Sequence, residues 1–260
     1  NTAVTQSRLG TLAQARGEYD KAQHLYQQAL HAFESLQLRL QEAQVLFLLG
    51  SLIQSRGDYT EARSMYKPCL ATFENLGNPS GEAGVISQLG MLYMEEGDST
   101  TAKEYHEKSL SICRRVGDKS GIADNLRQLG VLAQLQGNYR EAHDLYQQSL
   151  GMFNEMDSQA GIARTISRLA TLYRDEGNYT KAKELLEKSL AICQTLEDKE
   201  WIATNLRQLG ILARLNGNYT TAQEFYQQSL QISEMLRDKT GIAHTHHEIE
   251  ILMRLVIQDK

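Results

Sequence analysis

The sequence predicts an all-α protein, a right-handed superhelical solenoid of about six helix-turn-helix repeats with a C-terminal capping helix. Three observations lead to this fold class. Only two of the 260 residues are proline, and good helix formers such as leucine, alanine and glutamine are plentiful. The sequence matches itself at an offset of 40 residues, as Leu9 matches Leu49 and Leu89. A pair of glycines, as in Gly50 and Gly57, recurs in five of the six units, and the fifth has Ala170 in place of the first glycine.

The repeats divide the chain at regular intervals, and we expect one solenoid over residues 1–260. The repeats comprise residues 1–39, 40–79, 80–119, 120–159, 160–199 and 200–239, followed by a terminal helix at 240–257. A single pair of helices leaves its apolar face open to water, so neighbouring repeats must stack to form a core. Each large side chain buried in this way contributes about 1.5–3 kcal/mol.

Each repeat is predicted to contain two helices, named helix A and helix B in chain order. In the second repeat, helix A is expected over residues 40–56 and helix B over residues 60–76. Gly57 and its equivalents end helix A, because a residue without a Cβ can adopt positive φ. The expected N-caps of helix A are Ser80, Ser120 and Thr240. Those of helix B are Asp20, Thr60, Thr100, Thr180 and Thr220.

Small residues recur where helices A and B of one repeat should cross. Gly10 in helix A, with Ala22 and Ala29 in helix B, represents these positions. Tyr26 and its equivalents are expected to fill the space beside them. The terminal helix departs from the pattern, because Glu250 stands where earlier repeats have glycine or alanine. We expect this helix to cap the stack; truncation is the alternative, and the start at Asn1 suggests a fragment of a longer chain.

This pattern resembles the tetratricopeptide repeat. Its elements are Leu-Gly, then Gly-x-Tyr-x-x-Ala, then tyrosine and a small residue, as in Leu49-Gly50, Gly57 to Ala62, Tyr66 and Cys69. The resemblance covers residues 1 to about 237. The usual proline near the end of helix B is absent, which explains a unit of 40 residues rather than about 34. The long unit is similar to repeats of kinesin light chains, cell-polarity adaptors, peptide-responsive bacterial regulators and bacterial signalling-ATPase (STAND) sensor arms.

A second period, twice as long as the first, is also visible. Residues 125–150 match residues 205–230 at most positions, and NLRQLG opens both segments. Cys113 and Cys193 are likewise separated by two repeats. We infer that a pair of repeats was duplicated, so surface chemistry should recur at every second repeat.

The resemblance implies a non-enzymatic scaffold or sensor arm that mediates protein–protein interaction, with helix A lining a concave groove. The predicted partner-binding residues are Arg127, Gln128, Val131, Leu135, Arg164, Arg168, Arg174, Arg207, Gln208, Ile211, Arg214, Leu215 and Arg254. Arginine presents a planar fork that suits carboxylates, so an extended acidic peptide or protein segment is the expected partner. The alternative is that these arginines only solvate the surface and pair with carboxylates such as Asp124 and Asp175.

Composition argues against other partner classes. The net charge of −5 disfavours nucleic acid and anionic membranes, both of which attract basic proteins. No stretch approaches the roughly 18 apolar residues of a membrane span. Cys69, Cys113 and Cys193 show no disulfide or metal spacing, which favours a cytoplasmic location. We expect no cofactor.

Catalytic chemistry is not indicated. Cys113 and Cys193 occupy a position that holds Phe153 in another repeat, so we expect them to be buried packing residues. His247 and Glu248 could share a metal with His244, although their order is not H-E-x-x-H; we expect an exposed helix and no metal. The alternative function is a regulatory domain of a larger enzyme, such as a signalling ATPase. Its catalytic part, absent here, would then be a partner within the same parent chain.

Overall fold

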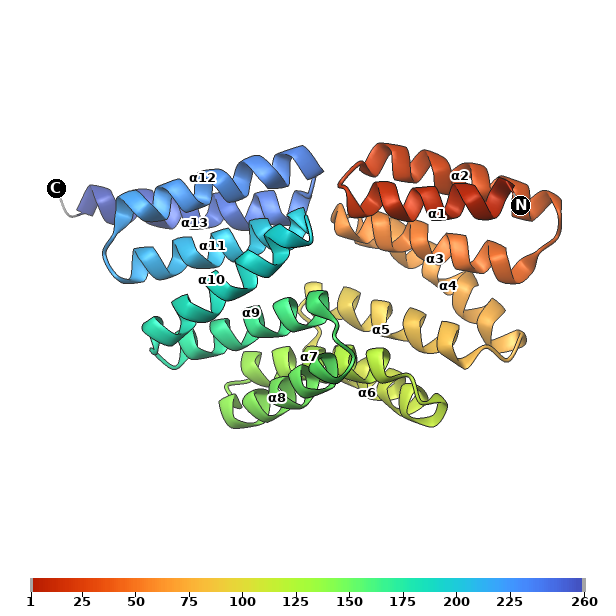
Figure 1. The fold of residues 1–260 in the computed structure, drawn as a ribbon, viewed down its shortest axis with the longest axis horizontal. Helices are drawn as coiled ribbons and strands as arrows, with labels where there is room; N and C mark the ends of the chain where they lie inside the picture. The colour runs from red at the N-terminus through yellow and green to blue at the C-terminus, as the bar shows by residue number, and fades with distance from the viewer. Residues whose placement is uncertain (1, 259–260) are drawn as a thin grey trace. The chain divides into compact units, whose positions relative to one another are not determined.

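The computed structural model describes residues 2–258, which form thirteen α-helices joined by short turns (Figure 1). Helix A of successive repeats is α1 (Thr2–Ala15), α3 (Arg39–Ser55), α5 (Pro79–Glu95), α7 (Lys119–Leu135), α9 (Gln159–Asp175), α11 (Lys199–Leu215) and α13 (Lys239–Gln258). Helix B is α2 (Tyr19–Ser35), α4 (Tyr59–Asn75), α6 (Ser99–Val116), α8 (Tyr139–Glu155), α10 (Tyr179–Thr195) and α12 (Tyr219–Leu236). The predicted all-α class is confirmed.

The chain forms two compact units, residues 1–152 (unit 1) and residues 153–260 (unit 2). Unit 1 contains α1 to α7 and most of α8, and unit 2 contains the end of α8 and α9 to α13. Within each unit, a helix B packs against the helix A of its own repeat and against the next helix A, as α6 packs against α5 and α7. The continuous solenoid over residues 1–260 stays a prediction. Among the described residues, none of the helices has the length and apolar character needed to cross a bilayer.

Helices A and B of a repeat cross at the predicted small residues. A Cβ atom added to Gly50 would lie 2.6 Å from Cε1 of Tyr66, whose side chain is fully buried. The Tyr66 hydroxyl donates a hydrogen bond to Oε1 of Gln54 at 2.7 Å. In the fifth repeat the pair is different, because Ala170 shares a core cluster with Leu186. Glycine with tyrosine, or alanine with leucine, therefore fills the same space.

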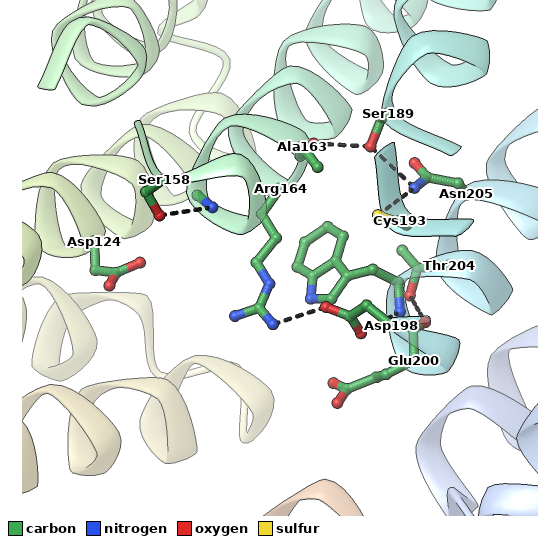
Figure 2. A network of polar contacts seen from close by, with 12 residues as sticks. Asp124, Ser158, Ala163, Arg164, Ser189, Cys193, Asp198, Glu200, Thr204 and Asn205 are labelled. Carbon is green, nitrogen blue, oxygen red and sulfur yellow. Dashed lines mark hydrogen bonds and ion pairs between the residues drawn. The ribbon is translucent and has the colours of Figure 1, made fainter. Parts of the chain in front are cut away.

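A buried polar network ties helix B to both neighbouring A helices. In unit 2, Ser189 Oγ donates to the Ala163 carbonyl at 2.8 Å and accepts a hydrogen bond from Asn205 Nδ2 at 3.0 Å (Figure 2). The Asn205 amide also lies 3.7 Å from Cys193 Sγ. In unit 1 the same network appears two repeats earlier, where Asn125 donates to Ser109 Oγ at 2.9 Å. The duplication of a repeat pair thus extends into the core.

The N-caps differ from those expected from the sequence and lie two residues earlier. Asn78 and Asp118 cap α5 and α7, each accepting from the backbone N–H three residues later. Asp98 and Asn178 do the same for the B helices α6 and α10. The predicted caps were wrong because residues such as Ser80 already lie within the first helical turn, whereas the capping residue directly follows the turn that ends the preceding helix.

The glycines between helices A and B have positive φ as predicted, for example 80° at Gly57. The turn after helix B also needs a left-handed residue, which the sequence analysis missed. Gly77 and Gly117 supply it in two repeats. In the other repeats non-glycine residues adopt φ of 51° to 55°; they are Gln37, Asp157, Glu197 and Arg237.

Glu197→Gly should therefore stabilise the protein, although glycine usually destabilises a fold. A left-handed residue with a Cβ costs about 1–2 kcal/mol, more than the roughly 0.5–1 kcal/mol of chain entropy that glycine loses on folding. We expect a net gain of about 0.5 kcal/mol in the free energy of unfolding. The reciprocal change Gly117→Glu, at the equivalent position two repeats earlier, should destabilise. Urea denaturation followed by circular dichroism would measure both; a loss of stability in Glu197→Gly would contradict the argument.

Candidate functional site

Five of the six predicted arginines of unit 2 lie on α9 and α11, on a surface that we name the A-helix face. It comprises Arg164, Arg168 and Arg174 of α9, Trp201, Arg207, Gln208 and Arg214 of α11, and Glu248 of α13. Helix A of consecutive repeats contributes to it, and α11 contacts both α9 and α13. The regular repeat therefore places corresponding positions of three helices beside one another.

Two arginines of this face are arranged around a single tryptophan. The guanidinium carbons of Arg164 and Arg168 lie 5.7 Å and 5.4 Å from the centroid of the Trp201 ring, a distance typical of cation–π contacts. Arg164 also donates to Asp198 Oδ2 at 2.9 Å (Figure 2). Asp198 in turn accepts from the backbone N–H of Trp201 as the N-cap of α11. These contacts hold the Arg164 guanidinium at the first turn of α11.

Arg174 and Arg214 each connect two A helices. Arg174 Nη1 donates to Oε1 of Gln208 at 2.5 Å, and Nη2 of Arg174 donates to Asp175 Oδ1 at 2.7 Å. Arg214 Nη2 forms an ion pair with Glu248 at 3.0 Å. Both arginines therefore already have hydrogen-bonded or ion-paired partners within the protein. The pair of Arg174 with Asp175 is one that the alternative interpretation of the sequence named.

Arg207 differs from its neighbours. Its side chain is half-buried, and it makes no hydrogen bond or ion pair with any other residue that the structure describes. Burial lowers the pKa of its guanidinium below the ordinary value, while Glu248 and Asp238 act in the opposite direction. A desolvated cation without a hydrogen-bonded acceptor is costly, so Arg207 is the position on this face best suited to an external carboxylate.

The predicted residues of unit 1 are less accessible than expected. Arg127 and Gln128 of α7 retain only 6% and 5% of their surface, although polar groove residues were expected to face solvent. Arg127 Nη2 forms an ion pair with Asp124 at 2.7 Å, a partner that the alternative interpretation named. Of the apolar residues, Val131 is half-buried and Leu135 is 67% exposed. Leu135 is thus the most open predicted contact on α7.

The other predicted contacts of unit 2 also include both exposed and buried residues. Leu215 is exposed, whereas Ile211 is buried in a cluster with Tyr226 and Leu252. The packing of Ile211 makes it a core residue and not an exposed anchor, which corrects the expected role. Arg254 on α13 is exposed.

The histidine cluster of α13 has no metal-binding geometry in the structure. His244, His246 and His247 are exposed, and Glu248 pairs with Arg214. Within residues 2–258, no group of three or more histidine, cysteine or acidic side chains is arranged to hold a metal ion.

The cysteines are buried and unpaired, as expected for packing residues. Burial raises the pKa of Cys69 to about 12 and that of Cys193 to about 11, so both thiols stay protonated near neutral pH. Burial also raises the pKa of Cys113. These groups are poor nucleophiles and serve the core.

Sequence reasoning missed the partners of Arg164 and Arg214 and the role of Trp201. One signal was present, because Trp201 stands where Gly121, Gly161 and Gly241 stand in other repeats. A large aromatic residue at a glycine position indicates a local change of function or packing. Arg164 pairs with Asp198, the N-cap of the next helix A, and Arg214 pairs with Glu248 of α13, so only the stacking of the helices brings these groups into contact.

The family comparison agrees with this repeat geometry. The tetratricopeptide repeat family model matches residues 1–75, 81–155 and 161–235, which is most of the chain. The chain belongs to the tetratricopeptide repeat family. Curated proteins yield no significant match to this tetratricopeptide repeat chain.

Solved structures with the same fold include two Rap proteins and a signalling ATPase. A Rap protein complexed with Competence and Sporulation Factor shares 13% identity over 100% of this chain and 77% of its own, with a TM-score of 0.72. The Rap conjugation gene regulator of plasmid pLS20, in complex with the Phr* peptide, shares 15% identity over 91% of this chain and 63% of its own, with a TM-score of 0.76. The STAND protein PH0952 from Pyrococcus horikoshii, which has a tetratricopeptide repeat sensor, shares 16% identity over 99% of this chain and 43% of its own, with a TM-score of 0.61.

These comparisons establish the broad role of the chain. It is a tetratricopeptide repeat domain of the class that mediates protein–protein and peptide interactions, and the matching family describes a repeat unit and no enzyme. At identities of 13% to 16%, the similar structures add the fold alone.

Proposed function

We propose that this tetratricopeptide repeat domain is a non-enzymatic scaffold or sensor arm that binds an extended, acidic peptide segment on the A-helix face of unit 2. The observation that carries the proposal is Arg207, a half-buried cation with no hydrogen-bonded or ion-paired partner among the described residues. A peptide carboxylate would supply the missing acceptor. The complex of the similar Rap conjugation gene regulator with the Phr* peptide supports a peptide ligand in general terms.

The paired arginines would assist without being the main source of affinity. Arg164 and Arg174 already bind Asp198, Asp175 and Gln208, so a ligand carboxylate would share donors that are held in place. Exposed ion pairs contribute about 0.2–1 kcal/mol each, whereas micromolar affinity requires about 8 kcal/mol. The exposed Leu215 must therefore add apolar contact area.

Trp201 provides the test, because it is the single tryptophan of the chain and lies against Arg164 and Arg168. Acidic peptides from an extended-peptide library should change its fluorescence emission on binding, and their affinity should fall as salt concentration rises. Arg207→Ala should weaken binding by at least about tenfold, because a buried charge pair loses one partner.

Two controls make this test specific. Arg115→Ala removes an exposed arginine of α6 in unit 1 and should leave peptide affinity unchanged. Copies of the binding peptides with Glu and Asp replaced by Gln and Asn should bind much more weakly. Equal affinity for the amide copies, or for the Arg207→Ala protein, would disprove the carboxylate contact.

A regulatory arm of a signalling ATPase remains the alternative function, and other domains of the same parent chain are then the partners. The likeness to the STAND protein is consistent with this alternative through its fold. We also propose a cytoplasmic location, which the free, buried cysteines favour.

A further inference from the structure

A pocket lies on unit 1 between the B helices α6 and α8. Its volume is about 440 Å³, and its floor consists of Leu129, Leu132 and Ala133 of α7. Leu110 of α6 and Leu145 of α8 form apolar walls. None of these residues belongs to the predicted partner-binding set. The pocket is therefore a feature separate from the surface that carries the proposed peptide site.

The pocket exists because two aromatic residues of the preceding repeat are replaced by smaller ones. Ala133 and Leu145 correspond, one repeat earlier, to Tyr93 and Tyr105. The rings of these tyrosines pack with their centroids 5.1 Å apart and fill the equivalent space. Their replacement by alanine and leucine leaves a hollow of a shape that aromatic side chains fill elsewhere in this same protein.

The preceding repeat also covers its aromatic pair with a salt bridge. The Arg63 guanidinium lies 4.9 Å from the Tyr93 ring centroid and binds Glu96 at 2.6 Å. The corresponding residues at the pocket are Lys103 and Gln136, which cannot form an ion pair. The pocket therefore combines an apolar floor with a lysine, Lys103, that lacks the ion-paired glutamate found in the preceding repeat.

Charged side chains without partners surround the pocket. They are Lys103, Glu107 and Arg114 on α6 and Glu141 on α8, and none makes a hydrogen bond or ion pair with another described residue. The two cations lie on one wall. An acidic group on a bound segment would find an unpaired lysine or arginine there, and a basic group would find Glu141.

We propose that this pocket binds a helical segment of a partner protein that inserts an aromatic side chain and places a carboxylate one helical turn further on. The segment reproduces in trans what Tyr93 and Glu96 provide in cis in the preceding repeat. Its aromatic ring packs on Ala133, and its carboxylate pairs with Lys103. The site is an interaction surface in addition to the proposed peptide site of unit 2.

The test uses the intact chain with ¹³C-labelled leucine methyl groups. The probe is a short alanine-based helical peptide with a tyrosine and, three positions later, a glutamate. We expect saturable shifts of the methyl signals of Leu110, Leu129, Leu132 and Leu145. A peptide with Gln in place of Glu should bind about two- to fivefold more weakly, as for one exposed ion pair. A peptide with Ala in place of Tyr should not bind.

Two variants decide whether the pocket is responsible. The double change Ala133→Tyr with Leu145→Tyr copies the preceding repeat and should abolish the shifts. The far-ultraviolet circular dichroism spectrum of this variant should match that of the unmodified chain, which would show that it folds. Lys103→Glu leaves the apolar floor intact and should remove the preference for the glutamate peptide. Arg207→Ala, which alters only the separate site of unit 2, should leave the shifts of the four pocket leucines unchanged. No saturable shift in the unmodified chain, or undiminished shifts in a folded filled-pocket variant, would overturn the proposal. So would equal binding of the tyrosine and alanine peptides.

Discussion

Gly130→Ala is expected to lower the free energy of unfolding by about 2 kcal/mol, although alanine is normally the better helix residue. A Cβ at position 130 would lie 2.7 Å from Cε1 of Tyr146, which is fully buried and donates to Gln134 at 2.9 Å. Overpacking of this kind costs about 3 kcal/mol, which exceeds the roughly 1 kcal/mol gained by replacing glycine in a helix. Urea denaturation monitored by circular dichroism would measure the change.

The fifth repeat suggests the compensating change. There Ala170 packs in the same cluster as Leu186, so Tyr146→Leu should recover much of the stability lost in Gly130→Ala. Gly151 supplies the matched control, because it lies in α8 with open space around its Cα, and Gly151→Ala should gain about 1 kcal/mol. Equal effects of alanine at positions 130 and 151 would contradict the crossing geometry.

His106 should make unit 1 less stable as the pH falls. Burial lowers its pKa from 6.5 to about 4, and nearby Arg127 acts in the same direction, whereas the hydrogen bond with Asn125 opposes the shift. Below pH 6.5 the unfolded chain binds a proton that the folded chain does not. The free energy of unfolding should therefore fall between pH 6.5 and pH 4, by about 3 kcal/mol in total.

His106→Leu is the control for this prediction. The fifth repeat already combines a buried leucine, Leu186, with the equivalent asparagine, Asn205, so the variant should fold. Carboxylates titrate in the same pH range in both proteins, and the difference between their stability profiles isolates the histidine. Parallel profiles between pH 4 and pH 6.5 would show that His106 is protonated without cost.

Much of the fold could be predicted because the same residue pattern occurs in every repeat, so each repeat supports the helix boundaries expected for the others. Helix α3 was expected over residues 40–56 and found at Arg39–Ser55, and α4 was expected over 60–76 and found at Tyr59–Asn75. The N-caps were predicted less well. Asp98 and Asn178 look like turn residues in the sequence, and only the structure shows that their side chains accept a hydrogen bond from the amide three residues later.

The candidate site was predictable in composition but not in contacts. The arginines of α9 and α11 were identified, and so was Asp175 as a partner, yet other partners belong to a different helix; Arg214, for example, meets Glu248 of α13. Such pairs depend on the angle at which one helix A follows the next, which residue patterns do not encode. Likewise, the burial of Arg127 depends on its surroundings in three dimensions and not on its own chemistry.

The buried asparagine network has a consequence for how such an array can change in length. Cys113 meets Asn125, and two repeats later Cys193 meets Asn205. If residues 120–199 were excised, Asn205 would take the position of Asn125 and contact Cys113 in the same way. If only residues 120–159 were excised, Thr165 would stand opposite Cys113 in place of an asparagine. Evolution would therefore lengthen or shorten this protein most easily by two repeats at a time, so that related chains should differ by even numbers of repeats.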